Sequence, residues 1–156
     1  AIGAKIANRD KDVVLITGDG GFQMNIQEMA TAVTQGTPIT ICLLNNYYLG
    51  MVRQMQELFY GKRYSATCLR KRPGCPNDCK GPNDACPKYT PDFVKLAESY
   101  GAYGIRVESV DDIDAAFAEA KKHQDAPTVI EFMIATDELV LPMVKSGNPM
   151  SEMILK

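Results

Sequence analysis

The feature that most constrains this chain is a short apolar, β-branched run at residues 12–17 that ends directly in Gly-Asp-Gly-Gly at 18–21. Such a run is typical of a strand buried in a parallel sheet, because half-exposed strands usually alternate apolar and polar residues. A second apolar run, residues 39–44, ends in the same way in Asn-Asn at 45–46. Polar residues after two buried strands predict a ligand site at the carboxyl ends of those strands.

The rest of the chain alternates predicted helices and strands. Asn25 and Glu28 have the spacing of a capping box, which predicts a helix that begins at Asn25 and ends at Gly36. Further helices are predicted over 49–59, from 90 to 100 with Thr90 as the cap, and from 109 to 120, and further strands over 102–107 and 128–134. The apolar face of the helix at 49–59 is expected to comprise Met51, Val52, Met55 and Phe59. The order predicts an α/β fold with a doubly wound, mostly parallel sheet and crossover helices.

Composition and charge exclude two classes of protein. The chain has 156 residues, of which 46% are hydrophobic, and a formal net charge of −2, which fits one domain with a sizeable core. No apolar run approaches the roughly 20 residues of a membrane span, and near-neutrality gives no general electrostatic reason to bind nucleic acid. Residues 1–9 resemble the tail of an amphipathic helix, so we expect residues 1–156 to be a single domain of a longer protein.

Residues 61–88 differ in composition from the remainder. They hold four of the nine prolines and seven Lys or Arg against two Asp, a local charge of +5 that leaves −7 elsewhere, and we interpret them as an insertion. Its cysteines are Cys68, Cys75, Cys79 and Cys86. The spacing C-x6-C-x3-C-x6-C lacks the C-x2-C arms of zinc ribbons and does not match iron–sulfur runs. A zinc tetrathiolate, an iron–sulfur cluster, two disulfides and reduced thiols all stay open.

The two polar strand ends have the chemistry of a metal-bridged diphosphate site. Twenty-four residues separate Gly20 from Asn45, enough for a helix and a return strand that place the two ends side by side. The Asp19 carboxylate and the Asn46 amide oxygen are hard donors of the kind that Mg²⁺ accepts together with phosphate oxygens. The N-terminus of the following helix, near Asn25, would offer N–H groups to a phosphate.

These motifs resemble a known family. Gly-Asp-Gly at 18–20 followed after 24 residues by Asn-Asn matches the diphosphate motif of thiamine-diphosphate enzymes. The runs GGFQMNIQEM at 20–29 and LNNYYLGMVRQMQ at 44–56 resemble the catalytic large subunit of acetohydroxyacid (acetolactate) synthase. The resemblance resumes at 89–93 and again at 140–147, so it covers nearly the whole chain outside the insertion.

The resemblance implies a set of site residues. Asp19 and Asn46 would bind Mg²⁺ through their side chains, and Tyr48 would bind it through its main-chain carbonyl. Gly20 and Gly21 would donate N–H groups to the diphosphate. The full implied cofactor-binding set is Gly18, Asp19, Gly20, Gly21, Asn46, Tyr48, Leu49, Gly50 and Met51.

For the full-length protein the resemblance implies synthesis of acetolactate or acetohydroxybutyrate, in branched-chain amino acid biosynthesis, from pyruvate and a second 2-oxo acid with loss of CO₂. In this family an amino-terminal domain supplies the catalytic glutamate and a middle domain binds FAD. No catalytic residue is therefore assigned to this chain, which is expected to be inactive alone. The resemblance also implies a cytoplasmic homo-oligomer that can carry a regulatory subunit.

The chain departs from the family at two positions. Met55 stands where the synthases usually have a Trp that shapes the pocket for the second substrate, which puts the preference for 2-oxobutyrate in doubt. Val52 stands where related decarboxylases tend to carry a glutamate, which favours carboligation. The sole histidine, His123, lies among lysines and is interpreted as a solvated helix end.

Two alternatives stay open. One is another thiamine-diphosphate carboligase, oxidase or decarboxylase, which would use the same cofactor residues. The other is a non-enzymatic metal-sensing or redox-sensing module built on the four cysteines. The second gives no role to Asp19 and Asn46, so cofactor binding separates the two.

Overall fold

The computed structural model describes residues 1–76, 86 and 91–155, and the chain divides into two compact units. Unit 1 comprises Ala1–Asn46 and Tyr89–Ile134, and unit 2 comprises Tyr47–Lys88 and Ala135–Lys156. The cysteine-rich segment therefore belongs to unit 2. That residues 1–156 form one domain with an insertion at 61–88 stays a prediction.

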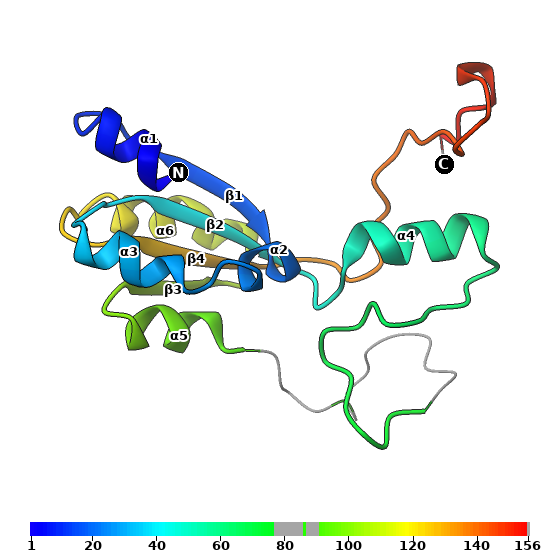
Figure 1. Ribbon diagram of the computed structural model, residues 1–156, viewed down its shortest axis with the longest axis horizontal. Helices are drawn as coiled ribbons and strands as arrows, with labels where there is room; N and C mark the ends of the chain where they lie inside the picture. Colours follow the sequence, from blue (N-terminus) through cyan, green and yellow to red (C-terminus); the bar gives the residue numbers. More distant parts are fainter. Residues whose placement is uncertain (77–85, 87–90, 156) are drawn as a thin grey trace. The chain divides into compact units, whose positions relative to one another are not determined.

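Unit 1 is built on a four-stranded parallel sheet (Figure 1). Its strands are β1 (Val14–Gly18), β2 (Thr40–Asn45), β3 (Tyr103–Val107) and β4 (Thr128–Met133), in the order β1-β2-β4-β3. Its helices are α1 (Ile2–Ala7), α2 (Asp19–Gln23), α3 (Glu28–Thr34), α5 (Phe93–Ser99) and α6 (Ile113–Ala120), with a 3₁₀ turn, η1, at Val110–Asp112. The predicted α/β class with a doubly wound parallel sheet is confirmed.

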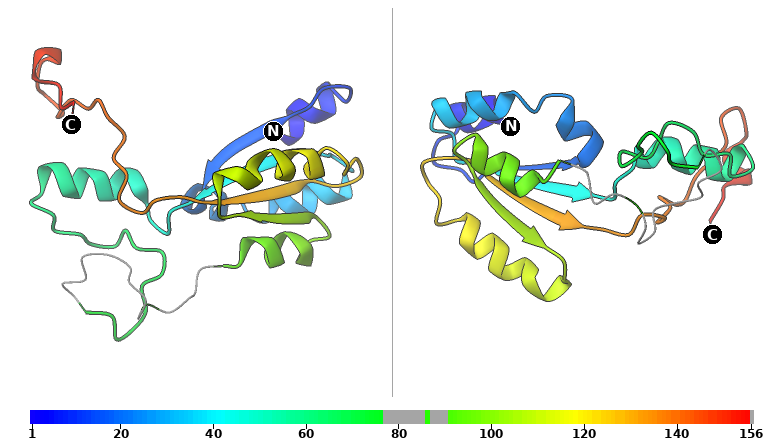
Figure 2. Two further views of the ribbon diagram at one scale, coloured as in Figure 1. Left: turned by 180° about the vertical axis from the view of Figure 1, so that it is seen from behind. Right: turned by 90° about the horizontal axis from the view of Figure 1, so that it is seen from below.

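Helices cover both faces of the sheet, as Figure 2 shows for α5 and α6. The core on one face joins α2, α3 and α5 to the sheet through Phe22, Met29, Ile39, Ile41, Leu43, Phe93, Ala97, Ala102 and Val129. The core on the other face joins α6 to the sheet through Val107, Ala116, Ala120 and Ile130. This follows from the strand order, because right-handed crossovers that run in opposite directions place their helices on opposite faces.

Two helix starts differ from the sequence-based expectation. Asn25 does not cap a helix: α2 begins directly at Asp19, and α3 begins at Glu28 after a turn in which the Glu28 N–H donates to the Asn25 carbonyl at 3.0 Å. In α5 the cap is Asp92 rather than Thr90, since the Asp92 side chain accepts the Lys95 N–H. Thr90 lies outside the described residues.

Unit 2 contains α4 (Gly50–Phe59) and a 3₁₀ turn, η2, at Met150–Glu152. The predicted apolar face of α4 is wrong, because Met51 and Val52 are 53% and 48% exposed whereas Arg53 and Gln54 are buried. The Gln54 amide explains this. It donates to the Val140 carbonyl at 2.9 Å and accepts the Val140 N–H at 2.7 Å, so it pairs with the backbone as a strand would.

The interpretation of His123 as a solvated helix end is also wrong. Its side chain is only 18% exposed, and its ring stacks on Tyr103 with the centroids 3.5 Å apart. Its Nδ1 lies 3.1 Å from the Thr128 hydroxyl at the start of β4. The imidazole therefore packs at the edge of the sheet.

Among the described residues, no helix has the length and apolar character needed to cross a membrane.

Gly104 on β3 allows a close approach between this strand and α5. A Cβ added there would lie 2.8 Å from the Val94 carbonyl oxygen and 2.9 Å from its Cα, so α5 or β3 must move to accept it. We expect Gly104→Ala to lower the free energy of unfolding by about 1–3 kcal/mol, measured by urea titration. Gly3→Ala in α1, where no atom lies within 4 Å of the added methyl, is the control and should not destabilise. Equal unfolding midpoints for both variants would contradict the close approach.

Candidate functional site

The polar ends of β1 and β2 lie side by side, as predicted. Gly18, the last residue of β1, is paired with Leu44 in the parallel register, so Asp19 directly follows β1 beside Asn45, the last residue of β2. Asp19 is the first residue of α2 and is only 2% exposed. A negative charge in the first turn of a helix is favourable, because unpaired backbone N–H groups point toward it. The Asp19 carboxylate accepts one of these, the Gly20 N–H, at 2.9 Å.

Asn45 is fixed at the end of β2 by its side chain and by its backbone. Its Nδ2 donates to Glu131 Oε1 at 2.7 Å, and its carbonyl accepts the Ile134 N–H at 3.1 Å. Both partners belong to β4 or to the residue just after it. Asn45 is fully buried, and Asn46, which follows it, is half-buried.

An ion-pair network around one buried carboxylate supports this strand end. Glu131 is 2% exposed, and its Oε2 accepts the Arg106 Nε–H at 2.9 Å. Arg106 also donates to the Asp92 carboxylate at 2.8 Å. Burial opposes the charge of Arg106, but the two carboxylates outweigh it and raise its pKa. Burial likewise raises the pKa of Asp92, yet the Lys95 N–H and Arg106 hold that pKa below its ordinary value.

Sequence reasoning missed Glu131 and Arg106. The available signal was a single charged residue inside each of the two runs TVIEFM and YGIRV, which otherwise have the composition of strands. A charge at a buried strand position needs a partner, because an unpaired ion in the interior costs several kcal/mol. The two residues are paired across β3 and β4 in the sheet register.

In unit 2 the segment 47–49 pairs with 67–69. The Leu69 N–H donates to the Tyr47 carbonyl at 2.9 Å, and the Leu49 N–H donates to the Thr67 carbonyl at 2.8 Å. Tyr48, which is buried, therefore lies opposite Cys68 in an antiparallel bridge. Tyr47 has a φ of 64°, a left-handed conformation that costs free energy in a residue with a side chain and is concentrated at functional sites.

Buried Arg53 organises the inner side of α4. Its guanidinium lies 5.1 Å from the centroid of the Tyr48 ring and 4.7 Å from that of Tyr64, and it forms a 3.2 Å ion pair with Glu57. Burial and a hydrogen bond to Glu57 raise the pKa of Tyr64. On its outer side, α4 carries a cavity of about 440 Å³ lined by Val52, Met55, Gln56, Tyr60 and Arg63. Met55 is one of the residues that line this cavity, and its place in a substrate pocket stays a prediction.

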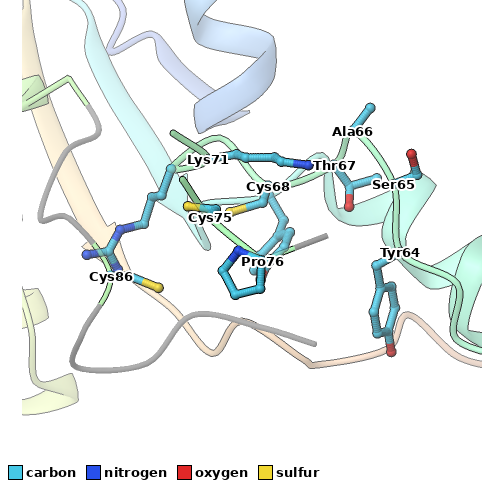
Figure 3. Close-up of a pocket in the computed structure, with 11 residues that line it drawn as sticks. Tyr64, Ser65, Ala66, Thr67, Cys68, Lys71, Cys75, Pro76 and Cys86 are labelled. Atoms are coloured by element: carbon cyan, nitrogen blue, oxygen red, sulfur yellow. The ribbon is translucent and has the colours of Figure 1, made fainter. Parts of the chain in front are cut away.

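Three of the four clustered cysteines line one small cavity in unit 2 (Figure 3). Cys68, Cys75 and Cys86 lie on its wall together with the basic residues Arg70 and Lys71, and its volume is about 50 Å³. The Cys75 sulfur accepts the Arg72 N–H at 3.3 Å. Cys79 lies outside the described residues. Within the parts of the chain that are described, no group of three or more His, Cys, Asp or Glu is arranged to hold a metal ion.

Residues 1–132 match the protein family described as thiamine pyrophosphate enzyme, C-terminal TPP binding domain. The chain belongs to this family. The match includes both polar strand ends and the whole four-stranded sheet except Met133. Thiamine diphosphate (TPP) is therefore the cofactor of this domain.

Relatives of this TPP-binding domain include acetolactate synthase large subunits. That of Corynebacterium glutamicum is 43% identical over 152 residues, which cover 97% of this chain and 22% of the relative. That of Haemophilus influenzae is 39% identical over 155 residues, covering 99% and 24%. A probable large subunit of Methanococcus aeolicus is 42% identical over 154 residues, covering 99% and 22%. The resemblance found in the sequence is confirmed, and the chain spans about a quarter or less of these relatives.

A solved structure supports the fold. The thiamine diphosphate-dependent 4-hydroxybenzoylformate decarboxylase of Rhodococcus jostii RHA1 superposes with a TM-score of 0.66 at 29% identity, over 89% of this chain and 23% of that protein. The fold of this TPP-binding domain is thus like that of a decarboxylase, whereas its sequence identity to the synthases above is higher than its identity to that decarboxylase.

The Asp92–Arg106 pair of the TPP-binding domain gives a test by pH. Because the pKa of Asp92 is lowered in the folded state, its charge stabilises the fold at neutral pH, and this contribution is lost as the pH falls below about 4. Asp92→Asn keeps a capping side chain but removes the charge, so we expect a loss of about 0.5–1 kcal/mol at pH 7 that disappears at low pH. Unfolding by urea across this pH range measures it.

Asp114→Asn, an exposed acid in the first turn of α6, is the control for a general helix-dipole effect. A difference between Asp92→Asn and the parent that stayed constant down to pH 2 would contradict the charge pair.

Proposed function

We propose that the full-length protein is a TPP-dependent acetolactate synthase that condenses pyruvate with a second 2-oxo acid and releases CO₂. The observation that carries the proposal is the juxtaposition of Asp19 with Asn45-Asn46 at adjacent strand ends, in a chain about 40% identical to acetolactate synthase large subunits along 97–99% of its length. The adjacent strand ends support cofactor binding, and the sequence identity to acetolactate synthase large subunits supports the choice of reaction.

The proposed metal is Mg²⁺, held by the Asp19 carboxylate, the Asn46 amide oxygen and the Tyr48 carbonyl. These donors fit a hard cation, which takes oxygen ligands and completes its shell with phosphate and water. Asp19 also fits because a carboxylate that is 2% exposed has lost most of its hydration, which a bound cation would replace. Gly20 and Gly21 are proposed to donate N–H groups to the diphosphate.

The remaining roles concern the two ends of the cofactor. When bound, TPP supplies the carbon that takes up the two-carbon unit of pyruvate. Leu49, Gly50 and Met51, at the start of α4, would contact its thiamine portion. Met55 would line the pocket of the second 2-oxo acid, where its flexible thioether fills space differently from an aromatic ring. The glutamate that activates the cofactor and the FAD site are proposed to lie in other domains of the full-length protein.

The proposal is tested in the full-length protein with Asp19→Ala. We expect the parent to bind TPP only with Mg²⁺ and to convert pyruvate to acetolactate, measured colorimetrically as acetoin after acid decarboxylation. Asp19→Ala removes a buried metal ligand and should weaken Mg²⁺-dependent TPP binding by at least tenfold, measured by isothermal titration. Asp10→Ala, an exposed acid before β1, should bind as the parent does.

The products decide between the synthase and a decarboxylase. A full-length protein that released CO₂ and acetaldehyde from pyruvate without joining two substrates would contradict the synthase and favour the decarboxylase alternative. A protein that bound no TPP would overturn both. The proposal also includes a cytoplasmic homo-oligomer that can carry a regulatory subunit.

We further propose that Cys68, Cys75, Cys79 and Cys86 bind zinc or an iron–sulfur cluster. The composition supports the idea, because a Pro-rich and Lys-rich segment with little apolar content needs a cross-link or a bound metal to be ordered. Three of the cysteines, all among the described residues, line one cavity but are not arranged there as metal ligands, so metal binding would have to draw them together. Elemental analysis should find zinc or iron in the anaerobically purified protein, and Cys68→Ser should lower the content while buried Cys42→Ser should not. A protein that contained neither zinc nor iron would contradict this proposal, and reduced thiols or disulfides would be the remaining alternatives.

A further inference from the structure

We propose that Glu131 is a positioning residue of the cofactor site, which holds Asn45 so that the next residue, Asn46, is presented to the metal. This inference rests on the proposed function, because it takes Asn46 as a Mg²⁺ ligand. Glu131 itself is not placed among the ligands. It acts through its hydrogen bond to Asn45, and all the contacts involved lie within unit 1.

Two hydrogen-bond donors, one for each carboxylate oxygen, fix the orientation of the Glu131 side chain. Oε1 accepts the Asn45 amide at 2.7 Å and Oε2 accepts the Arg106 Nε–H at 2.9 Å, so each oxygen faces a donor. Arg106 is held in turn by Asp92, the cap of α5. Only a side chain with two acceptor oxygens can accept from both donors. An amide at position 131 would have one acceptor oxygen and one NH₂ group, so it could accept from only one of the two donors in this arrangement.

The location of this charge argues for a role beyond stability. A buried ion pair is weak evidence for stabilisation, because well-packed apolar residues often serve as well or better. Glu131 is on the inner strand β4, opposite Leu43 of β2, where an apolar residue would continue the core. Its carboxylate instead reaches the strand end. Combined with the Ile134 N–H on the Asn45 carbonyl, it fixes both the side chain and the backbone of Asn45.

The fixed end matters because the chain changes direction immediately after it. Asn46 leaves the strand, and Tyr47 has the left-handed backbone described above. A side chain on such a turn keeps its direction only if the residue before it is held. Residues that orient a metal ligand from outside the coordination shell typically change metal affinity by about 10–100-fold when they are mutated.

The experiment measures Mg²⁺ affinity in the full-length protein at saturating TPP, by isothermal titration, together with urea unfolding of each variant. Glu131→Gln keeps the shape and loses one acceptor, and we expect it to weaken Mg²⁺ binding by at least tenfold. Asn45→Asp sets two carboxylates against each other and should weaken binding as well.

The double variant, which combines Asn45→Asp with Glu131→Gln, exchanges the donor and the acceptor of this hydrogen bond. The new carboxylate at position 45 can accept from the new amide at position 131, and the oxygen of that amide can still accept from Arg106. Mg²⁺ affinity should therefore recover relative to either single variant.

The control is Glu119→Gln, an exposed glutamate of α6 that pairs with Lys122. If Glu131→Gln destabilised the fold but bound Mg²⁺ within twofold of the parent, the positioning role would be overturned while the proposed function stood. If Glu131→Gln did not fold, the comparison of Asn45→Asp with the double variant would decide, and no recovery would overturn the role. A parent that bound no Mg²⁺ with TPP would overturn the proposed function, and this inference with it.

Discussion

The parallel register between β1 and β2 is the constraint on which the site depends. Because Gly18 pairs with Leu44, Asp19 directly follows β1 beside Asn45, the last residue of β2, so a carboxylate and the two amides of Asn45 and Asn46 come at the same end of the sheet. A slip by one residue would turn every side chain of a strand to the opposite face, so apolar burial fixes the register strongly. The hydrophobic core of unit 1 thereby determines the positions of polar groups that are not part of it.

The strands and the class of fold were predictable, because the apolar runs before residues 18 and 45 predict strands of a parallel sheet. Burial of the second run as β2 was predicted correctly, whereas burial of the first was wrong, because β1 is an edge strand on which Val14 and Ile16 are 51% and 71% exposed. The resemblance to TPP enzymes could be recognised in the sequence because it rests on two short motifs at a fixed spacing. Helix starts were harder. Asn25 has a good capping side chain, yet α2 starts at Asp19 despite two glycines, because buried Phe22 packs edge-on against Phe93 of α5, 5.8 Å away. Tertiary packing outweighed local propensity there.

The errors at α4 and His123 have one physical origin. The spacing of apolar residues along a helix predicts which apolar side chains are buried. It cannot predict polar side chains that are buried because they are hydrogen-bonded to distant residues. Gln54 is buried against Val140, and Asn45 is buried against Glu131, and each of these pairs is separated by 86 residues in the sequence. His123, which follows α6, is largely covered by stacking on Tyr103 of β3. No local pattern contains such partners.

These two distant pairs lie on either side of a strained segment in the sequence, one pair within unit 1 and the other within unit 2. Residues 46–51, which include the left-handed Tyr47, lie in the sequence between Asn45 and Gln54, and each of these amides hydrogen-bonds to the stretch 131–140. An unfavourable backbone conformation persists only where its surroundings over-determine it. An apolar side chain at position 45 or 54 could be buried, but it would make no directional hydrogen bond to orient the backbone. A hydrogen-bonded amide fixes direction as well as burial, and the metal and cofactor ligands proposed for this segment would require both.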